Sequence, residues 1–326
     1  MRVGIFCTLD HHDEDGVSPR QSYERALGEA ELAEELGLES FWITEHHFST
    51  YGICPDPAVL LAAMSQRTRR LRLGTATAVL PFDQPLRLAE SYALLDQISG
   101  GRLELGVGSG YLRHEFEGFG LDPEARRERF DETLAILRQA WAGEPVLHQG
   151  RLLQVRAPSL NVRPLQAGGP PLHIGITRAA AAPYVGRQAL ALATVPYISL
   201  GSAAQLGALI SAYRAALPSG TRGGVTAALH AFCSTGPNDP DLFRAREALA
   251  RYLRTRVVPG ARYAGTPPAE DFVLFGPADA LLARLRALGD LGVDRVLLLT
   301  SFGGLAPELV AASLARLAPR LGQLGA

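Results

Sequence analysis

The sequence has no lysine and no cluster of basic residues. Its 32 basic residues are all arginine, they are spread along the chain, and 33 acidic residues balance them to a formal charge of −1 at pH 7. Nucleic-acid-binding domains carry a basic patch or stripe that neutralises phosphates. The charge distribution therefore argues against nucleic acid as a partner.

Cysteine is also scarce. Cys7, Cys54 and Cys233 are odd in number, far apart and without a CxxC pair. A disulfide framework needs an even, patterned set of cysteines, and a structural zinc site needs closely spaced ligands. We expect three small buried thiols in a protein of a reducing compartment.

Long apolar stretches are missing as well. No run of about 18 uninterrupted apolar residues occurs, and the opening "MRVGIFCTLD" has too short an apolar run for a signal peptide. The expectation is a soluble cytoplasmic protein with no membrane partner.

Short apolar runs that favour β-strands alternate with longer helical patterns along the whole chain. The eight runs are "RVGIFCTL", "SFWITEH", "LRLGTATA", "RLELGVG", "PLHIGI", "QALALATV", "GVTAALHAF" and "RVLLLTSF". Between them apolar residues recur at every third or fourth position, as in "QSYERALGEAELAEELG". Eight βα units close into a barrel, whereas an open doubly wound sheet usually needs fewer strands. The sequence therefore predicts an α/β fold, a (β/α)8 TIM barrel that forms one domain over residues 1–326.

Two segments are longer than ordinary connections. We interpret residues 143–170 as an insertion after the fourth helix and a segment from about 236 to 275 as an insertion after the seventh strand. The first contains "VLHQGRLLQV", a candidate hairpin. Residues 258–275 are dense in proline and glycine, which makes them a candidate lid, with a disordered linker as the alternative.

The second strand ends on titratable groups in "FWITEHHF", which places Glu45, His46 and His47 at the carboxyl end, where barrel enzymes hold their active sites. A histidine buried there is neutral near pH 7, and a nearby carboxylate would fix its tautomer. Successive side chains of a strand face opposite ways, so either His46 or His47 faces the mouth, and we favour His46.

A metal site is the alternative reading of these histidines. The stretch "LDHHDED" adds His11, His12 and three carboxylates after the first strand, and barrel hydrolases draw metal ligands from several strand ends. Neither stretch has the HExxH spacing. We expect no metal, and we interpret "HHDED" mainly as a solvated loop.

Small residues end two further strands. The third ends in "LGTATAVLP", the fourth in the glycine-rich "RLELGVGSGY", and such ends let a flat ligand approach the backbone, although they also suit tight turns and strand packing. The fourth strand's GxGxG spacing does not match a dinucleotide fingerprint. After the fifth strand, Thr177 is placed to cap a helix beginning near Arg178, whose free N–H groups would suit a terminal phosphate.

The stretches "FWITEHHFSTYG", "LRLGTATAVLPFDQPLRLAE" and "LLDQISGGRLELGVGSGY" carry a resemblance through their order and spacing. Together the chain resembles the bacterial luciferase-like family of flavin-dependent monooxygenases over nearly its whole length. The resemblance implies a barrel that binds reduced FMN, or in some branches a deazaflavin, at the mouth near strands two to four. It implies that His46 is the active-site histidine, which assists the flavin hydroperoxide intermediate, and that Glu45 is its supporting carboxylate.

The resemblance also implies a set of cofactor contacts. It places a non-proline cis peptide bond between Ala76 and Thr77, beneath the flavin ring, and assigns the phosphate to the start of the helix after strand five with help from an arginine of the fourth helix. The implied contacts are Thr75, Ala76, Thr77, Gly106, Gly108, Ser109, Arg127, Thr177, Arg178 and Ala179. The sequence departs from the family in two places. Luciferase itself has cysteine and arginine where Gly108 and Ser109 stand, and "GITRAAAA" replaces a serine-rich phosphate loop, so a weaker grip on a diffusible flavin is expected.

The implied activity is the oxygenation of a small organic substrate, such as an aldehyde or ketone, by reduced FMN and O2. A separate flavin reductase would be the functional partner, and "DPAVLLAAMSQRT" with "PLRLAESYALLDQIS" would supply the face of a homodimer. Deazaflavin-dependent hydride transfer and a non-catalytic flavin-binding relative stay open as alternatives.

Overall fold

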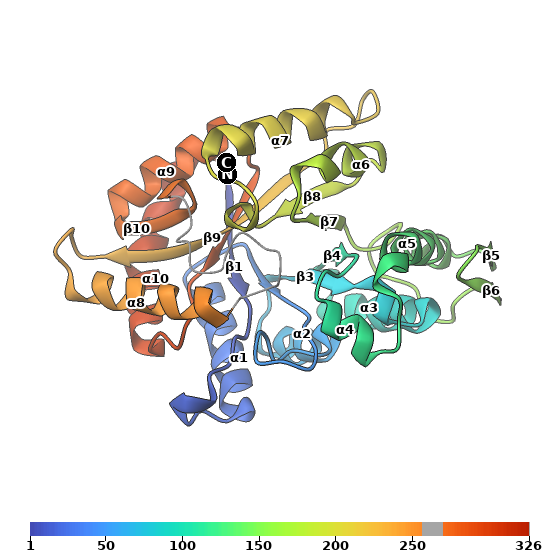
Figure 1. Ribbon diagram of the computed structural model, residues 1–326, viewed down its shortest axis with the longest axis horizontal. Helices are drawn as coiled ribbons and strands as arrows, with labels where there is room; N and C mark the ends of the chain where they lie inside the picture. Colours follow the sequence, from blue (N-terminus) through green and yellow to red (C-terminus); the bar gives the residue numbers. More distant parts are fainter. Residues whose placement is uncertain (256–269, 326) are drawn as a thin grey trace.

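The computed structural model describes residues 1–255 and 270–325, and within them eight parallel strands close into a barrel (Figure 1). Each predicted strand is present. The barrel strands are β1 Arg2–Cys7, β2 Ser40–Ile43, β3 Arg72–Val79, β4 Leu103–Gly108, β7 Leu172–Ile176, β8 Ala191–Thr194, β9 Val225–Ser234 and β11 Arg295–Leu299. They pair in this order, and β11 pairs with β1 to close the ring. The TIM-barrel prediction is confirmed.

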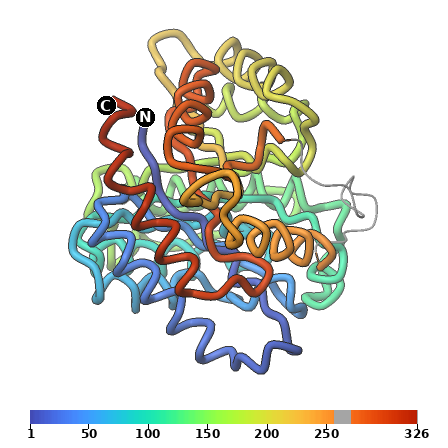
Figure 2. Tube along the Cα trace, turned by 90° about the vertical axis from the view of Figure 1, so that its left-hand side faces the viewer, coloured from blue at the N-terminus to red at the C-terminus, as the bar shows by residue number. Residues whose placement is uncertain are grey.

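Ten helices are described around and beyond the barrel. They are α1 Pro19–Glu35, α2 Pro57–Arg67, α3 Pro85–Ser99, α4 Arg113–Gly118, α5 Arg126–Ala142, α6 Ala182–Arg187, α7 Ala203–Ala215, α8 Pro240–Thr255, α9 Ala278–Asp290 and α10 Pro307–Leu321. Local chemistry sets several of their ends. Ser18 and Gln21 form a capping box before α1, Asp56 caps α2 and Gly100, with a φ of 70°, ends α3. The chain ends meet, because the amino group of Met1 donates to the carbonyl of Gly325 (Figure 2).

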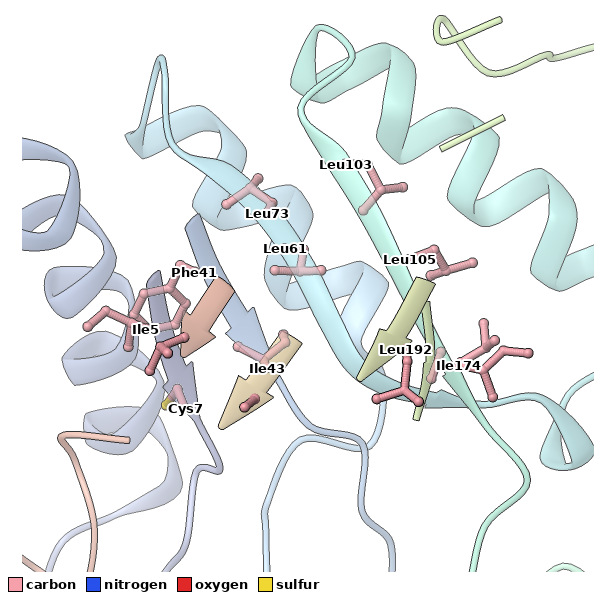
Figure 3. Packing of buried hydrophobic residues seen from close by; sticks show 14 of the residues in the cluster. Ile5, Cys7, Phe41, Ile43, Leu61, Leu73, Leu103, Leu105, Ile174 and Leu192 are labelled. Atoms are coloured by element: carbon pink, nitrogen blue, oxygen red, sulfur yellow. The ribbon is translucent and has the colours of Figure 1, made fainter. Parts of the chain in front are cut away.

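Successive residues of each strand alternate between two packing layers. Ile5 and Cys7 of β1 and Phe41 of β2 belong to the large cluster between strands and helices, part of which Figure 3 shows. Phe6 and Trp42, one residue along, belong to a second cluster inside the barrel. The period of two explains why the strands read as continuous apolar runs: both faces are buried.

The barrel interior also holds a charged group at the amino ends of its strands. Arg295 of β11 is fully buried and contacts Glu104 of β4 through two nitrogens, at 2.7 and 2.8 Å. His173 of β7 lies 2.8 Å from the same carboxylate, and the Arg295 guanidinium lies 5.1 Å from the centre of the Trp42 ring. These contacts tie four strands together across the barrel.

The two long segments contain more regular structure than expected. The hairpin predicted in "VLHQGRLLQV" is present as the antiparallel strands β5 Val146–Gln149 and β6 Gln154–Ala157. In the segment after β9, however, residues 240–255 form α8, and β10 Val273–Pro277 adds a ninth strand beside the end of β9. Most of the candidate lid, residues 258–269, lies outside the described residues.

The helix α8 is amphipathic, which sequence inspection missed because its flanks are rich in proline. Its apolar side, which includes Leu249, Tyr252 and Leu253, packs into the barrel-interior cluster with Phe6 and Leu299. This part of the predicted insertion is therefore a helix that packs against the residues inside the barrel.

Candidate functional site at the barrel mouth

His46 lies just beyond the carboxyl end of β2 and is 8% exposed. Its Nδ1 atom is 3.1 Å from Oε1 of Glu115, on α4, and its backbone N–H donates to the carbonyl of Cys54. A carboxylate accepts a hydrogen bond from a protonated Nδ1, and in the neutral ring the lone pair then belongs to Nε2. The geometry defines the tautomer of His46.

Glu115 also holds the neighbouring backbone, because the N–H of His47 donates to its Oε1 at 2.9 Å. It is 2% exposed. Sequence inspection missed this residue because "YLRHEFEGFG" does not form a clean apolar helix face. A carboxylate in the first turn of a short helix that follows a barrel strand was the available signal, since such a helix lies at the mouth.

Glu45 does not support His46 as expected. Its Oε1 lies 3.1 Å from Nε2 of His47, and its Oε2 accepts the backbone N–H of Val79. Burial raises the pKa of Glu45, and the hydrogen bond from His47 opposes this rise. The alternation of side chains along "EHH" therefore gives two separate pairs, Glu115 with His46 and Glu45 with His47.

Aromatic rings surround both histidines. The His47 ring packs edge-on against Phe82 and Phe119, with ring centres 5.5 and 4.7 Å away. On the other side, the Tyr51 ring lies 4.6 Å from that of His46, and its hydroxyl is 2.7 Å from the hydroxyl of Tyr111. Tyr51 follows β2 and Tyr111 follows β4, so the two loops meet beside His46.

The peptide bond between Ala76 and Thr77 is cis, at the position that the family resemblance implies. Both residues are partly exposed. Thr75, also expected to contact a cofactor, is fully buried, and its hydroxyl donates to the carbonyl of Gly106 at 2.6 Å. Thr75 therefore ties β3 to β4, and Ala76 and Thr77 are the members of this stretch that a ligand can reach.

The glycines at the end of β4 make room for protein atoms. A Cβ atom on Gly106 would lie 2.1 Å from the carbonyl oxygen of Thr75, and one on Gly108 would lie 2.4 Å from Oγ1 of Thr77. Gly175 of β7 gives the same room to the methyl group of Thr77. Close approach by a ligand was the expected reason for Gly106 and Gly108; the structure shows strand packing as a reason, and Ser109 beyond them is partly exposed.

The loop after β7 was expected to bind phosphate. Thr177 is partly exposed and Arg178 and Ala179 follow it, but the next turn begins at Ala179 with Arg178 at its N-cap position and without a side-chain capping bond. The expectation that Thr177 caps a helix was wrong, because a 3-10 turn at Ala179–Ala181 precedes α6.

Arg127 of α5 contacts α6, the helix that follows this loop. Its guanidinium is 4.9 Å from the ring centre of Tyr184, whose hydroxyl donates to Asp131. Burial, followed by the hydrogen bond to Asp131, raises the pKa of Tyr184. Arg127 thus contacts the helix that begins three residues after Ala179.

The stretch after β1 is more ordered than a solvated loop. His11 and His12 are buried, and Nε2 of His12 lies 2.9 Å from Asp10, which also accepts the N–H of Gly303. Glu14 and Asp15 are paired with Arg251 of α8. The expectation of a solvated loop was wrong for the two histidines, which are buried, whereas Asp13, Glu14 and Asp15 are exposed as expected. Among residues 1–255 and 270–325, no three histidine, cysteine or acidic side chains are grouped so as to hold a metal ion.

Comparisons with known proteins identify the family of this chain. The family model described as luciferase-like monooxygenase matches residues 1–295. The oxygenase component of the flavin-dependent trigonelline monooxygenase of Acinetobacter baylyi is 30% identical over 176 residues, 53% of this chain and 48% of the relative. The chain spans about half the length of the curated relatives it matches, between 43% and 58% for three others.

Solved structures match over almost the full chain. The monooxygenase RslO1 of Streptomyces bottropensis is similar with a TM-score of 0.87 and 28% identity over 99% of both chains. The oxygenating constituent of 3,6-diketocamphane monooxygenase of Pseudomonas putida, in complex with FMN, has a TM-score of 0.81 and 20% identity, covering 98% of this chain and 99% of that one. A coenzyme F420-dependent reductase of Methanopyrus kandleri shares the fold at 0.69 and 17%, over 98% and 99%. In the described part of the chain, no helix has the length and apolar character to span a membrane.

Proposed function

Because the chain belongs to the luciferase-like monooxygenase family, we propose that it is a flavin-dependent monooxygenase that oxygenates a small organic substrate, such as an aldehyde or ketone, with reduced FMN and O2. The observation that carries the proposal is the buried pair of His46 and Glu115 at the barrel mouth. A positioned histidine of defined tautomer is the group that general acid–base chemistry needs.

The residues at the mouth fit a flavin. Ala76 and Thr77 offer small, partly exposed side chains to a flat ring, and Ser109 adds a hydroxyl beside them. Arg127, together with Thr177, Arg178 and Ala179, would hold the terminal phosphate, since a fixed guanidinium and nearby hydroxyl or amide donors suit such a group. When bound, a reduced flavin supplies the electrons that activate O2.

His46 would hold or transfer the proton that oxygen transfer requires. With Nδ1 held by Glu115, the ring accepts or donates a proton at Nε2 while its orientation stays fixed. The carboxylate of Glu115 also stabilises the imidazolium that forms when His46 takes up a proton. Glu45, bound to His47 and to the N–H of Val79, would fix the second histidine and the end of β3 in the wall of the site.

The aromatic wall would exclude water from the site. Tyr51 and Tyr111 lie edge-on to the imidazole of His46, and Phe82 and Phe119 pack edge-on against the ring of His47. An apolar enclosure strengthens the hydrogen bonds of His46 and Glu115 and limits side reactions with water.

A separate flavin reductase would supply the reduced cofactor. The support is the relative from Acinetobacter baylyi, whose description as an oxygenase component implies a second component. Structures that share this fold bind FMN or depend on coenzyme F420, so a binding experiment has to decide which of the two cofactors this protein uses.

The test combines binding with oxygen consumption. We expect reduced FMN to bind more tightly than coenzyme F420, and the protein with reduced FMN, O2 and a panel of aldehydes and ketones to form an oxygenated product. His46→Ala should keep flavin affinity within about twofold and lower product formation by about 10²-fold or more. Preferential F420 binding with hydride transfer would replace the monooxygenase by the deazaflavin alternative, and unchanged turnover in His46→Ala would remove the assigned role of His46.

A further inference from the structure

A cavity of about 340 Å³ lies on the outer side of the barrel, between α1 and α10. Cys7 at the end of β1, Phe302 three residues after β11 and Val310 of α10 line it. Its volume is within the range of sites for small ligands. None of the residues that surround His46 lines it, so this space is separate from the proposed active site.

Glu29 brings a carboxylate to this cavity from the middle of α1. It is 9% exposed, its Oε1 accepts the hydroxyl of Thr300 at 2.6 Å, and its Oε2 accepts the hydroxyl of Ser301 at 2.8 Å. Within the described residues no basic side chain lies at ion-pair distance from Glu29. Burying a carboxylate without a charged partner is costly, and burial raises its pKa. An ionised carboxylate offers about four acceptor positions, so two hydroxyl donors leave room for a third.

Gly28 lines the same cavity. A glycine inside a helix lowers stability by about 0.5–1 kcal/mol relative to alanine. Packing does not require it here, because an added Cβ would meet no atom within 4 Å. Glu29 and Gly28 are adjacent in α1, and neither the buried carboxylate nor the missing side chain is required for the helix to form.

The remaining lining sets the chemistry of an occupant. It is mainly apolar, with Leu9, Leu32 and Val310 among the side chains. The carboxylate of Asp10 also lines the cavity, and Arg25, one turn before Glu29, is an exposed residue at its edge. His12 and the N–H of Gly303 already contact Asp10, so the carboxylate of Glu29 is the group that favours a cation over an anion here.

We propose that this cavity binds a small primary amine with a hydrocarbon body, whose ammonium group donates a hydrogen bond to the carboxylate of Glu29. The ammonium supplies the positive partner that the buried carboxylate has not found in the described chain, and the hydrocarbon part covers the apolar wall. A charge-assisted hydrogen bond of this kind is stronger than one between neutral groups.

The test is a calorimetric titration of the full-length protein with benzylamine at neutral pH. We expect one saturable site with a dissociation constant of about 1 mM or lower, weaker binding of benzyl alcohol and none of benzoate. Glu29→Gln should weaken benzylamine by about tenfold or more and leave FMN binding unchanged. Glu35→Gln, an exposed change on the same helix, is the matched control and should bind as the unchanged protein does.

Gly28→Leu gives a second, independent arm, because its side chain enters the cavity from a position where nothing opposes it. We expect this variant to lose benzylamine binding with no fall in melting temperature. Equal benzylamine affinity in Glu29→Gln, or no saturable binding to the unchanged protein, would overturn the proposal. Either result leaves the assignment of His46 untouched, because that site shares no lining residue with the cavity.

Discussion

The carboxylate of Glu115 lies 3.1 Å from Nδ1 of His46, across 69 residues of sequence. The strand β2 delivers the histidine and the short helix α4 delivers the carboxylate. Both groups are buried, so the contact is shielded from solvent and from salt. The pair therefore places the proton of the neutral His46 ring on Nδ1.

Replacing Glu115 by glutamine should separate positioning from binding. The amide oxygen can still accept from Nδ1, but the negative charge that stabilises a protonated His46 is lost. We expect kcat to fall by about 10-fold to 10²-fold, KM and flavin affinity to change less than threefold, and the kinetic pKa of the histidine in the pH–rate profile to fall.

Glu117→Gln is the matched control, since Glu117 lies on the same helix and forms an exposed ion pair with Arg113. It should leave the pH–rate profile in place. A Glu115→Gln enzyme with an unshifted profile would show that the carboxylate has only a structural role.

The barrel and the strand-end location of His46 were accessible from sequence because both follow from periodicity. Eight β-leaning runs in alternation with helical patterns allow few other closed arrangements. The hydrogen-bond partner of His46 could not be predicted from the sequence. Glu115 is 69 residues from His46 and its helix has six residues, too few for a period to show. Glu45, adjacent in sequence, was the natural guess, and alternation along the chain gives it to His47.

The position of Thr77 also depended on contacts that no single sequence reveals. Its side chain sits between Gly108 and Gly175, whose absent Cβ atoms would lie 2.4 Å from it. A glycine-rich strand end reads equally as a ligand cradle or as a packing site, because both need the same absence of a side chain. Only the three-dimensional pairing of β3, β4 and β7 separates the two.

Gly108→Ala should therefore displace the side chain of Thr77, which is the nearest group to the added methyl group. The added methyl group collides with Oγ1 of Thr77, and overpacking of this kind costs about 1–3 kcal/mol. We expect the free energy of unfolding in urea to fall by that amount, together with weaker flavin binding.

Thr77→Ala removes the colliding atoms, so the double variant should regain at least half of the stability lost in Gly108→Ala. A double-mutant cycle measures this coupling. Strictly additive losses would mean that Gly108 is required for some contact other than the one with Thr77.

The predicted homodimer can be tested on α2 and α3. Val59 of α2 is 67% exposed, and Leu94 and Ile98 of α3 are 51% and 44% exposed. Exposed apolar side chains on two packed helices are typical of an interface between subunits. We expect a dimer in sedimentation analysis, and we expect Leu94→Glu to raise its dissociation constant at least about 10-fold. Leu147→Glu, at an equally exposed residue of the hairpin, should have no effect. A monomer at micromolar concentration would contradict the prediction.

The buried group around Glu104 predicts how stability depends on pH. Burial lowers the pKa of His173, so the folded protein keeps this ring neutral, whereas the unfolded chain takes up a proton below about pH 6.5. The unfolded state then binds more protons, and the free energy of unfolding should fall as the pH drops from about 6.5 to 5. Hydrogen bonds from His173 and Arg295 hold the pKa of Glu104 below its usual range against the effect of burial, so a further loss of stability should begin below about pH 4.5.

His173→Gln keeps a donor for Glu104 but cannot titrate, and it should flatten the upper part of this curve while the lower part remains. His114→Gln, at an exposed histidine of α4, should leave both parts unchanged. Urea unfolding at half-unit pH steps measures all three proteins, and an upper slope that persists in His173→Gln would assign the proton uptake to another group.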